Sequence, residues 1–208
     1  MKMEKRTFEL DSLRIERRSE DAGGGAVLRG HAAVFDKWSF DLGGFREKIA
    51  MGAFAQAVKE DDVRALWNHD SSIILGRTKS GTLRLSEDRQ GLAIEVDLPA
   101  TRLIEDMMVG PVERGDVDQM SFAFGTRKDS WEEFPDKPER LAERTLLDVS
   151  LSDVSPVTYP AYPDTDVAVA MRSLDVWRNE HAPAAPDIIE EWEQQQAEMR
   201  QRLTEAML

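Results

Sequence analysis

The sequence predicts an α+β fold, a mainly antiparallel β-barrel or sandwich with a few helices around it. Seven or so short stretches alternate apolar and polar residues with the period of two that strands show. Most of these stretches are joined by hairpin-length loops, and only two interspersed stretches have helical spacing. The chain has 208 residues, 41% hydrophobic and 32% charged, which is enough apolar material for the core of one domain.

The N-terminal part begins with two predicted strands. Residues 7–15 alternate, and residues 20–25 form a loop whose three consecutive glycines disfavour a helix. Residues 26–35 are the second strand, and residues 36–46 a loop with a Gly-Gly pair. Apolar residues at helical spacing then predict a helix over 47–59.

The middle of the chain predicts three more strands and a short helix. Residues 63–67 form an apolar strand that ends at Asn-His-Asp. Residues 82–86 and 92–98 alternate cleanly on either side of a turn, which indicates an antiparallel hairpin. Residues 101–109 have helical spacing, and we expect Gly110-Pro111 to stop or kink this helix.

Two further strands and a charged loop complete the predicted domain. The strands cover residues 119–127 and 144–154, and the loop covers residues 128–139. Three prolines follow the second of these strands, and we expect them to break regular structure. They are Pro156, Pro160 and Pro163.

The C-terminal part differs in composition and predicts a separate element. We expect the domain to cover residues 7–172, a linker residues 173–186, and an amphipathic helix residues 187–208. The end of the linker is rich in Ala and Pro. The helix either packs back on its own domain or serves in assembly and partner binding, and its spacing does not decide between the two.

Charge and cysteine content exclude several classes of function. There are 40 Asp and Glu against 27 Lys and Arg, a formal charge of −13, which argues against a nucleic-acid binder. The chain has no cysteine, which excludes disulfides, cysteine nucleophiles and thiolate zinc sites. No apolar run is long enough to span a membrane and no signal peptide begins the sequence, so we expect a soluble, cytoplasmic protein.

Several common catalytic motifs are absent from the sequence. The sequence has no Gly-x-Ser-x-Gly, no Walker-type phosphate loop, no His-Glu-x-x-His and no dinucleotide fingerprint. The three histidines, at positions 31, 69 and 181, are too scattered to predict a metal site.

A histidine and a serine remain as candidates for chemistry. His69 directly follows an apolar strand, a position where a polar side chain can lie at the rim of the core. Such a histidine is more often structural than catalytic. Ser121 shares one face of its predicted strand with Ala123 and Gly125, which leaves room above it for a substrate. On its own, such a serine is more simply explained as a residue tolerated between small neighbours.

Two aspartates compete for a third position in the same site. Asp148 lies on the polar face of the strand 144–154, whereas Asp153 lies on the apolar phase, where a carboxylate needs a partner. A serine nucleophile needs a base, and the base needs a group that favours its cationic form. Three predicted strands supply a nucleophile, a base and a carboxylate, which are Ser121, His69 and Asp148.

These motifs, taken together, resemble the prohead (capsid maturation) proteases of tailed phages, serine peptidases whose fold is similar to the herpesvirus assemblin proteases. The blocks Asn68-His-Asp70, Met120-Ser-Phe122 and Val154-Ser-Pro-Val-Thr158 are specific as a set. Other matching stretches occur in the expected order at 30–36, 45–54, 75–78, 81–85, 91–99 and 114–119. The resemblance covers roughly residues 7–172 and implies an assemblin-like, mainly antiparallel barrel.

The resemblance implies a role for each candidate residue. The family's base corresponds to His69 and its nucleophile to Ser121. The acidic third member corresponds to Asp148 by position and strand phase, with Asp153 as the competitor. One candidate for the oxyanion hole is a turn at Ser155–Thr158. No metal or organic cofactor is implied.

The resemblance also implies a biological role. A protease of this family is packaged inside the immature capsid in the bacterial host cytoplasm, where it removes the scaffolding segment of the major capsid protein and usually cleaves itself. Assemblin relatives are activated by dimerisation, so self-association is expected here. The acidic tail after Arg172 lies outside the resemblance, and we expect it to tether the enzyme or to be shed by self-cleavage.

Two alternatives stay open from the sequence. One is a non-catalytic capsid scaffold or assembly chaperone on the same fold. The presence of a serine, a histidine and an aspartate that fit a catalytic site counts against it. The other is an unrelated β-barrel binding domain with an oligomerising helix, which a long distance between His69 and Ser121 would favour.

Overall fold

A computed structural model of the chain describes residues 3–9, 13–19, 25–137, 139–159 and 164–181. The described part is a mixed α+β structure with mostly strands and few helices, as expected. The larger sheet has six strands, in the order β1-β9-β10-β5-β6 with β4 also pairing with β10. The smaller sheet has four strands in the order β2-β3-β8-β7.

The bounds of the strands follow from their hydrogen bonding. In the larger sheet they are β1 (Glu4–Glu9), β4 (Phe45–Ile49), β5 (Arg64–Trp67), β6 (Asp70–Arg77), β9 (Gln119–Glu132) and β10 (Ala142–Val157). In the smaller sheet they are β2 (Arg14–Arg17), β3 (Ala26–Val34), β7 (Leu83–Glu87) and β8 (Gly91–Asp97).

The pairing is mainly antiparallel, with β10 as the exception. One edge of β10 pairs antiparallel with β9, while its other edge pairs parallel with β4 and then, further along, with β5. Hydrogen bonding among the described strands leaves two separate sheets, so the expected closed barrel is not confirmed.

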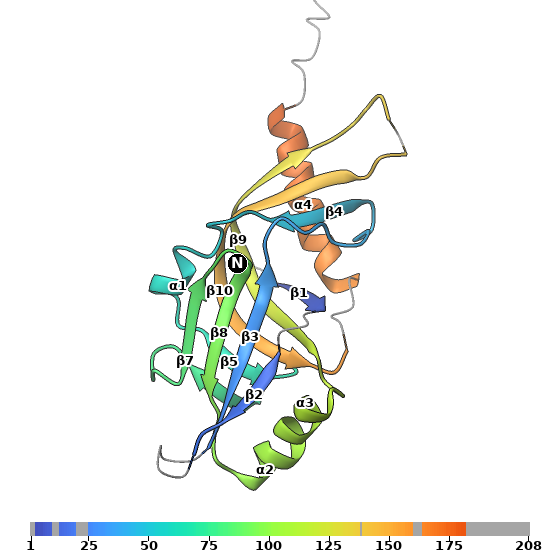
Figure 1. Cartoon of the computed structure of the whole chain (residues 1–208). Helices are drawn as coiled ribbons and strands as arrows, with labels where there is room; N and C mark the ends of the chain where they lie inside the picture. Colours follow the sequence, from blue (N-terminus) through green and yellow to red (C-terminus); the bar gives the residue numbers. More distant parts are fainter. Residues whose placement is uncertain (1–2, 10–12, 20–24, 138, 160–163, 182–208) are drawn as a thin grey trace, which may run out of the picture. The chain divides into compact units, whose positions relative to one another are not determined.

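The strands of both sheets, drawn as arrows in Figure 1, contribute buried side chains to one apolar core. Its centre is a run of aromatic rings, with ring centroids 5.5 Å apart for Phe54 and Phe122 and 4.9 Å apart for Phe122 and Phe124. The smaller sheet contributes Leu28 and Val96, both with no exposed surface. The core therefore covers the face of β9 that carries Phe122 and Phe124, and the polar side chains of this part of the strand lie on its opposite face.

The expected strand over 7–15 and the expected helix over 47–59 are both wrong. The first region holds two strands, β1 and β2, which belong to different sheets. In the second region Phe45, Glu47 and Ile49 are buried in alternation on β4, and only Ala57–Glu60 is helical (α1). Gly52 has a φ of +91°, and this left-handed residue prevents a helix from running through the region.

The helical segment after residue 101 continues past Gly110-Pro111, which was expected to stop or kink it. It consists of α2 (Arg102–Ile104), a π-helical turn over Glu105–Val109 and α3 (Gly110–Arg114). Pro111 lies just after the π-helical turn, where the regular i→i−4 hydrogen bonding is already interrupted, so its missing N–H does not end the segment. Gly115, with a φ of +78°, ends the segment.

Strands β9 and β10 are longer than their sequence patterns predict. Strand β9 takes in residues 128–132 of the expected charged loop 128–139. Strand β10 continues through Pro156, which was expected to break it. Pro156 lies opposite Met120 in the β9–β10 ladder. Two long strands therefore run side by side through the larger sheet.

The C-terminal region contains a helix that the sequence did not predict. Helix α4 spans Asp164–His181, so it includes residues 173–181 of the expected linker. The chain divides into two compact units, Met1–Ala170 and Met171–Leu208. The expected helix over 187–208 lies outside the described residues. None of the described helices is long and apolar enough to cross a membrane.

A buried ionic network connects four strands of the larger sheet. Arg144 on β10 has no exposed surface, and its Nη1 lies 2.8 Å from carboxylate oxygens of both Glu4 on β1 and Glu47 on β4. Its Nε lies 2.7 Å from Asp129 on β9. Arg6 of β1 bonds the same two glutamates, each at 2.8 Å. Because each buried charge has an opposite partner, the network ties β1 and β4 to the central strands.

Candidate active site

His69 lies in a two-residue turn between β5 and β6, a hairpin that the sequence analysis did not predict. Trp67 and Asp70 are paired across this turn. The two residues between them, Asn68 and His69, have φ values of +51° and +59°. Positive φ at both central residues is typical of the type I′ turn, whose twist matches that of the flanking strands. The imidazole therefore projects from a short, conformationally restricted tip.

Asn68 attaches this tip to the end of β10. Its backbone N–H donates to the carbonyl oxygen of Pro156 at 3.0 Å. Its side-chain Oδ1 accepts hydrogen bonds from the N–H of Thr158 at 2.9 Å and from the Thr158 hydroxyl at 3.2 Å. Asparagine suits this position because it tolerates a left-handed backbone and also offers an acceptor.

Ser121 lies near the start of β9, on the face opposite the core. The aromatic residues Phe122 and Phe124 belong to the core cluster, so the period of two places Ser121 and Ala123 on the other face. The alternation of bulky and small residues in the sequence predicts this arrangement. The structure brings the two first candidates together, since Ser121 Oγ lies 2.8 Å from His69 Nε2. Ser121 has no exposed surface, and the His69 side chain is 9% exposed.

Asp153, and not Asp148, is the carboxylate at His69. Its Oδ1 lies 2.5 Å from His69 Nδ1. The expectation for Asp148 is wrong because Asp148 pairs with Lys128, seven positions after Ser121 on β9, and a bulge in β10 brings Asp153 to the face of Ser121. The register with β9 shifts between Leu151 and Asp153, so Ser152 has no partner on β9. Before this bulge Val149 and Leu151 face the core, whereas after it Val154 does, and Asp153 moves to the face of Ser121.

Asp148 instead belongs to a separate ionic group. It is paired with Lys128 in the β9–β10 ladder and lies 3.5 Å from Nη1 of Arg127. Arg127 also contacts Asp61 at 2.8 Å. The other carboxylate oxygen of Asp61 accepts the N–H of Leu151 at 2.7 Å, next to the bulge. Asp148 therefore contributes to the surroundings of the bulge and has no contact with His69.

The three side chains form a continuous hydrogen-bonded relay with a defined direction. An ionised carboxylate only accepts hydrogen bonds, so His69 Nδ1 carries the proton that faces Asp153. In the neutral ring Nε2 is then unprotonated and accepts from the Ser121 hydroxyl. In this arrangement a base faces a hydroxyl, and a carboxylate stabilises the cation that forms when the base takes the proton.

The expected oxyanion turn at Ser155–Thr158 is wrong. Ser155, Pro156 and Val157 are part of β10 and pair with β9. The N–H of Thr158 is already donated to Asn68. This turn was expected because the oxyanion loop follows the third strand in the assemblins, but here the strand itself continues through Pro156 to Val157.

Gln119 shares the face of Ser121, two residues away on the same strand. Its Oε1 is buried and is the one such side-chain N or O atom within the described residues that has no hydrogen-bond partner. A buried acceptor without a partner is unusual in a folded protein. In the same described ranges, no group of three or more His, Asp or Glu side chains is arranged to hold a metal ion.

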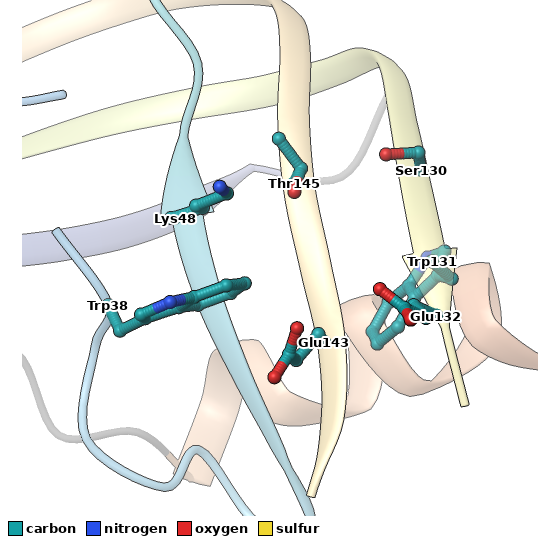
Figure 2. A pocket seen from close by; sticks show the side chains of 7 residues that line it. All are labelled: Trp38, Lys48, Ser130, Trp131, Glu132, Glu143 and Thr145. Carbon is teal, nitrogen blue, oxygen red and sulfur yellow. The ribbon is translucent and has the colours of Figure 1, made fainter. Parts of the chain in front are cut away.

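A separate pocket lies at the far ends of the long strands (Figure 2). Its volume is about 370 Å³, and it is lined by Trp38, Lys48, Ser130, Trp131, Glu132, Glu143 and Thr145. Arg46 and Lys48 lie over the Trp38 ring, at 4.6 and 5.0 Å from its centroid. Ser130 lies nine positions after Ser121 on β9, which is roughly 30 Å at the rise of a strand. The pocket is therefore not part of the relay.

The chain matches the model of a known protein family over most of its length. The family model described as caudovirus prohead serine protease matches residues 13–180. This match starts later and ends later than the range 7–172 inferred from the motifs. No curated protein matches the chain significantly. Among solved structures, the chain is similar to the bacteriophage T4 capsid assembly protease gp21, with 10% identity, a TM-score of 0.47, and coverage of 74% of this chain and 96% of that one.

Proposed function

Because this chain belongs to the caudovirus prohead serine protease family, we propose that it is a serine endopeptidase that shortens the major capsid protein during prohead maturation. Its substrate is the scaffolding segment of that protein, and it also cleaves itself. It acts inside the immature capsid, in the bacterial host cytoplasm. The observation that carries this proposal is the position of His69, which contacts Ser121 through one ring nitrogen and Asp153 through the other.

The proposed reaction follows from these contacts. Ser121 Oγ attacks the carbonyl carbon of the scissile peptide bond while His69 Nε2 takes the hydroxyl proton. Asp153 stabilises the imidazolium that forms and keeps the ring in the productive tautomer. The imidazolium then protonates the leaving amine, and an acyl-enzyme remains on Ser121. Water, deprotonated by His69, hydrolyses this ester and regenerates the serine.

The experiment uses shells rather than the isolated chain, because Ser121 is fully buried in the isolated chain. The chain is co-expressed with its cognate major capsid protein, and intact masses of both proteins are measured. Ser121→Ala is the test variant. Ser150→Ala is the matched control, because Ser150 also lies on a central strand and its hydroxyl donates across the ladder to Gly125 at 3.2 Å.

We expect shortening of the capsid protein with the wild type and with Ser150→Ala, and none with Ser121→Ala. The free energy of unfolding of Ser121→Ala should stay within about 1 kcal/mol of wild type, because the change is small. Shortening with Ser121→Ala would assign the nucleophile elsewhere or to a host protease. No shortening with any chain, in well-formed shells, would favour a non-catalytic scaffold.

A further inference from the structure

Ser155 is a buried hydroxyl that contacts the relay without belonging to it. It lies directly opposite Ser121 in the β9–β10 ladder and has no exposed surface. Its Oγ donates a hydrogen bond to Asp153 Oδ1 at 2.9 Å. This is the same oxygen that His69 Nδ1 approaches at 2.5 Å. Two donors from different elements therefore converge on one carboxylate oxygen.

The Asp153 carboxylate is buried and is held by hydrogen bonds from two elements. Of the residues that the structure describes, His69 and Ser155 are the ones whose side chains hydrogen-bond to it. The His69 donor lies at the tip of a two-residue turn, whereas Ser155 lies on the same strand as Asp153, two residues away and on the same face. Without Ser155, the rotation of the carboxylate about its χ2 angle would be limited by His69 alone. Terminal torsions of this kind have broad preferences and are not held by the rotamer itself.

We propose that Ser155 is a positioning residue of the relay, a role that rests on the proposed function. Its hydroxyl holds Oδ1 of Asp153 in the plane where it accepts from His69 Nδ1. This in turn keeps the unprotonated Nε2 directed at Ser121. The bulge at Ser152 is what allows the arrangement, because it places Asp153 and Ser155 together on the face of the nucleophile.

The first measurement is the cleavage rate in assembled shells. Ser155→Ala removes the hydroxyl, and Ser155→Thr keeps it on a side chain that strands accept. Ser150→Ala is the control, as above. A hydrogen bond to a charged group contributes enough that we expect Ser155→Ala to slow capsid-protein shortening about 10- to 100-fold. Ser155→Thr should recover most of the rate, and Ser150→Ala should not change it.

The second measurement reads the relay directly in the isolated chain. The protein has three histidines, so selective ¹⁵N labelling of the rings yields a spectrum that can be assigned by single substitutions. We expect the Nδ1 proton of His69 to resonate far downfield in the wild type. In Ser155→Ala this resonance should move upfield and broaden, while the signals of His31 and His181 stay in place.

The outcomes separate this proposal from the proposed function. An unchanged cleavage rate and an unchanged His69 resonance in Ser155→Ala would overturn the positioning role while Ser121→Ala still tests the protease. A Ser155→Ala chain that does not fold would identify a purely structural role and also overturn it. If the wild type itself failed to cleave, the protease proposal would fail, and the resonance would still report whether Ser155 holds Asp153.

Discussion

Asp153 reaches His69 because the residue before it, Ser152, is the extra residue of a β-bulge. Asp153 Oδ1 lies 2.5 Å from His69 Nδ1, and the register between β9 and β10 shifts at this point. Without the shift, Asp153 would face the core together with Val149 and Leu151. One inserted residue therefore places Asp153 on the face of Ser121 instead of in the core.

This geometry predicts different effects for two matched substitutions. Asp153→Asn should lower the rate of capsid-protein shortening by a factor on the order of 10⁴, because an amide no longer favours the productive tautomer and the cationic ring. Asp148→Asn, on the same strand, should leave the rate within about threefold of wild type. The measurement is intact mass against time in co-assembled shells. The reverse result would return the third role to Asp148.

The buried ionic network predicts a large stability change at one residue. Arg144→Met leaves Glu4 and Glu47 buried without their central partner, so we expect the free energy of unfolding to fall by about 3–5 kcal/mol. Arg84→Met is the control, because the 43% exposed Arg84 pairs with Glu95 and Asp97 at the surface, where ion pairs contribute about 0–1 kcal/mol. Urea titration of both variants checks this. Equal, small losses would mean that the network contributes little.

The same network predicts how stability depends on pH. Burial by itself raises the pKa of Glu4, but the hydrogen bond and charge of Arg144, with the charge of Arg6, outweigh it, so the pKa lies below its ordinary value of 4.5. A carboxyl with a lowered pKa in the folded state stabilises the protein above the unfolded value. That stabilisation is lost as the pH falls below 4.5 and through the folded value.

Glu4→Gln provides the measurement for this pH dependence. It removes the titrating group, so the free energy of unfolding should fall less steeply with decreasing pH below 4.5 than it does in the wild type. The absolute stability of the variant should be lower near neutral pH, because Arg144 and Arg6 lose a partner. If the free energy of unfolding fell equally steeply with pH in both proteins, the pKa of Glu4 would not be lowered in the folded state.

The buried Oε1 of Gln119 predicts a stabilising substitution. Gln119→Met replaces an unpartnered polar atom with an apolar side chain of similar length, so we expect the free energy of unfolding to rise by about 1 kcal/mol. Gln56→Met is the control, because Gln56 is exposed and its amide donates to Glu60. Thermal unfolding measures both. A loss of 1 kcal/mol or more in Gln119→Met would show that the amide has a partner in solution.

Local patterns predicted several parts of the molecule well. The hairpin β7–β8 and strand β3 are confirmed, and so is the family that the motifs indicated. The prediction of a helix over 47–59 was wrong because the same spacing of apolar residues also fits a strand followed by turns. The hairpin β5–β6 was missed because its turn is Asn-His, without the glycine that usually marks such a turn.

The sequence by itself determined that Ser121 faces away from the core. Strand β9 has no inserted residue around this position, so its bulky and small side chains separate by period alone. Only the tertiary structure decided the partner of His69, because a bulge inverts the facing of every residue after it and is formed between strands rather than within one. The roles of Ser155 and Asn68 could not be predicted from the sequence for a similar reason. The hydrogen bonds that define these roles depend on how the strands and the turn are arranged in the fold.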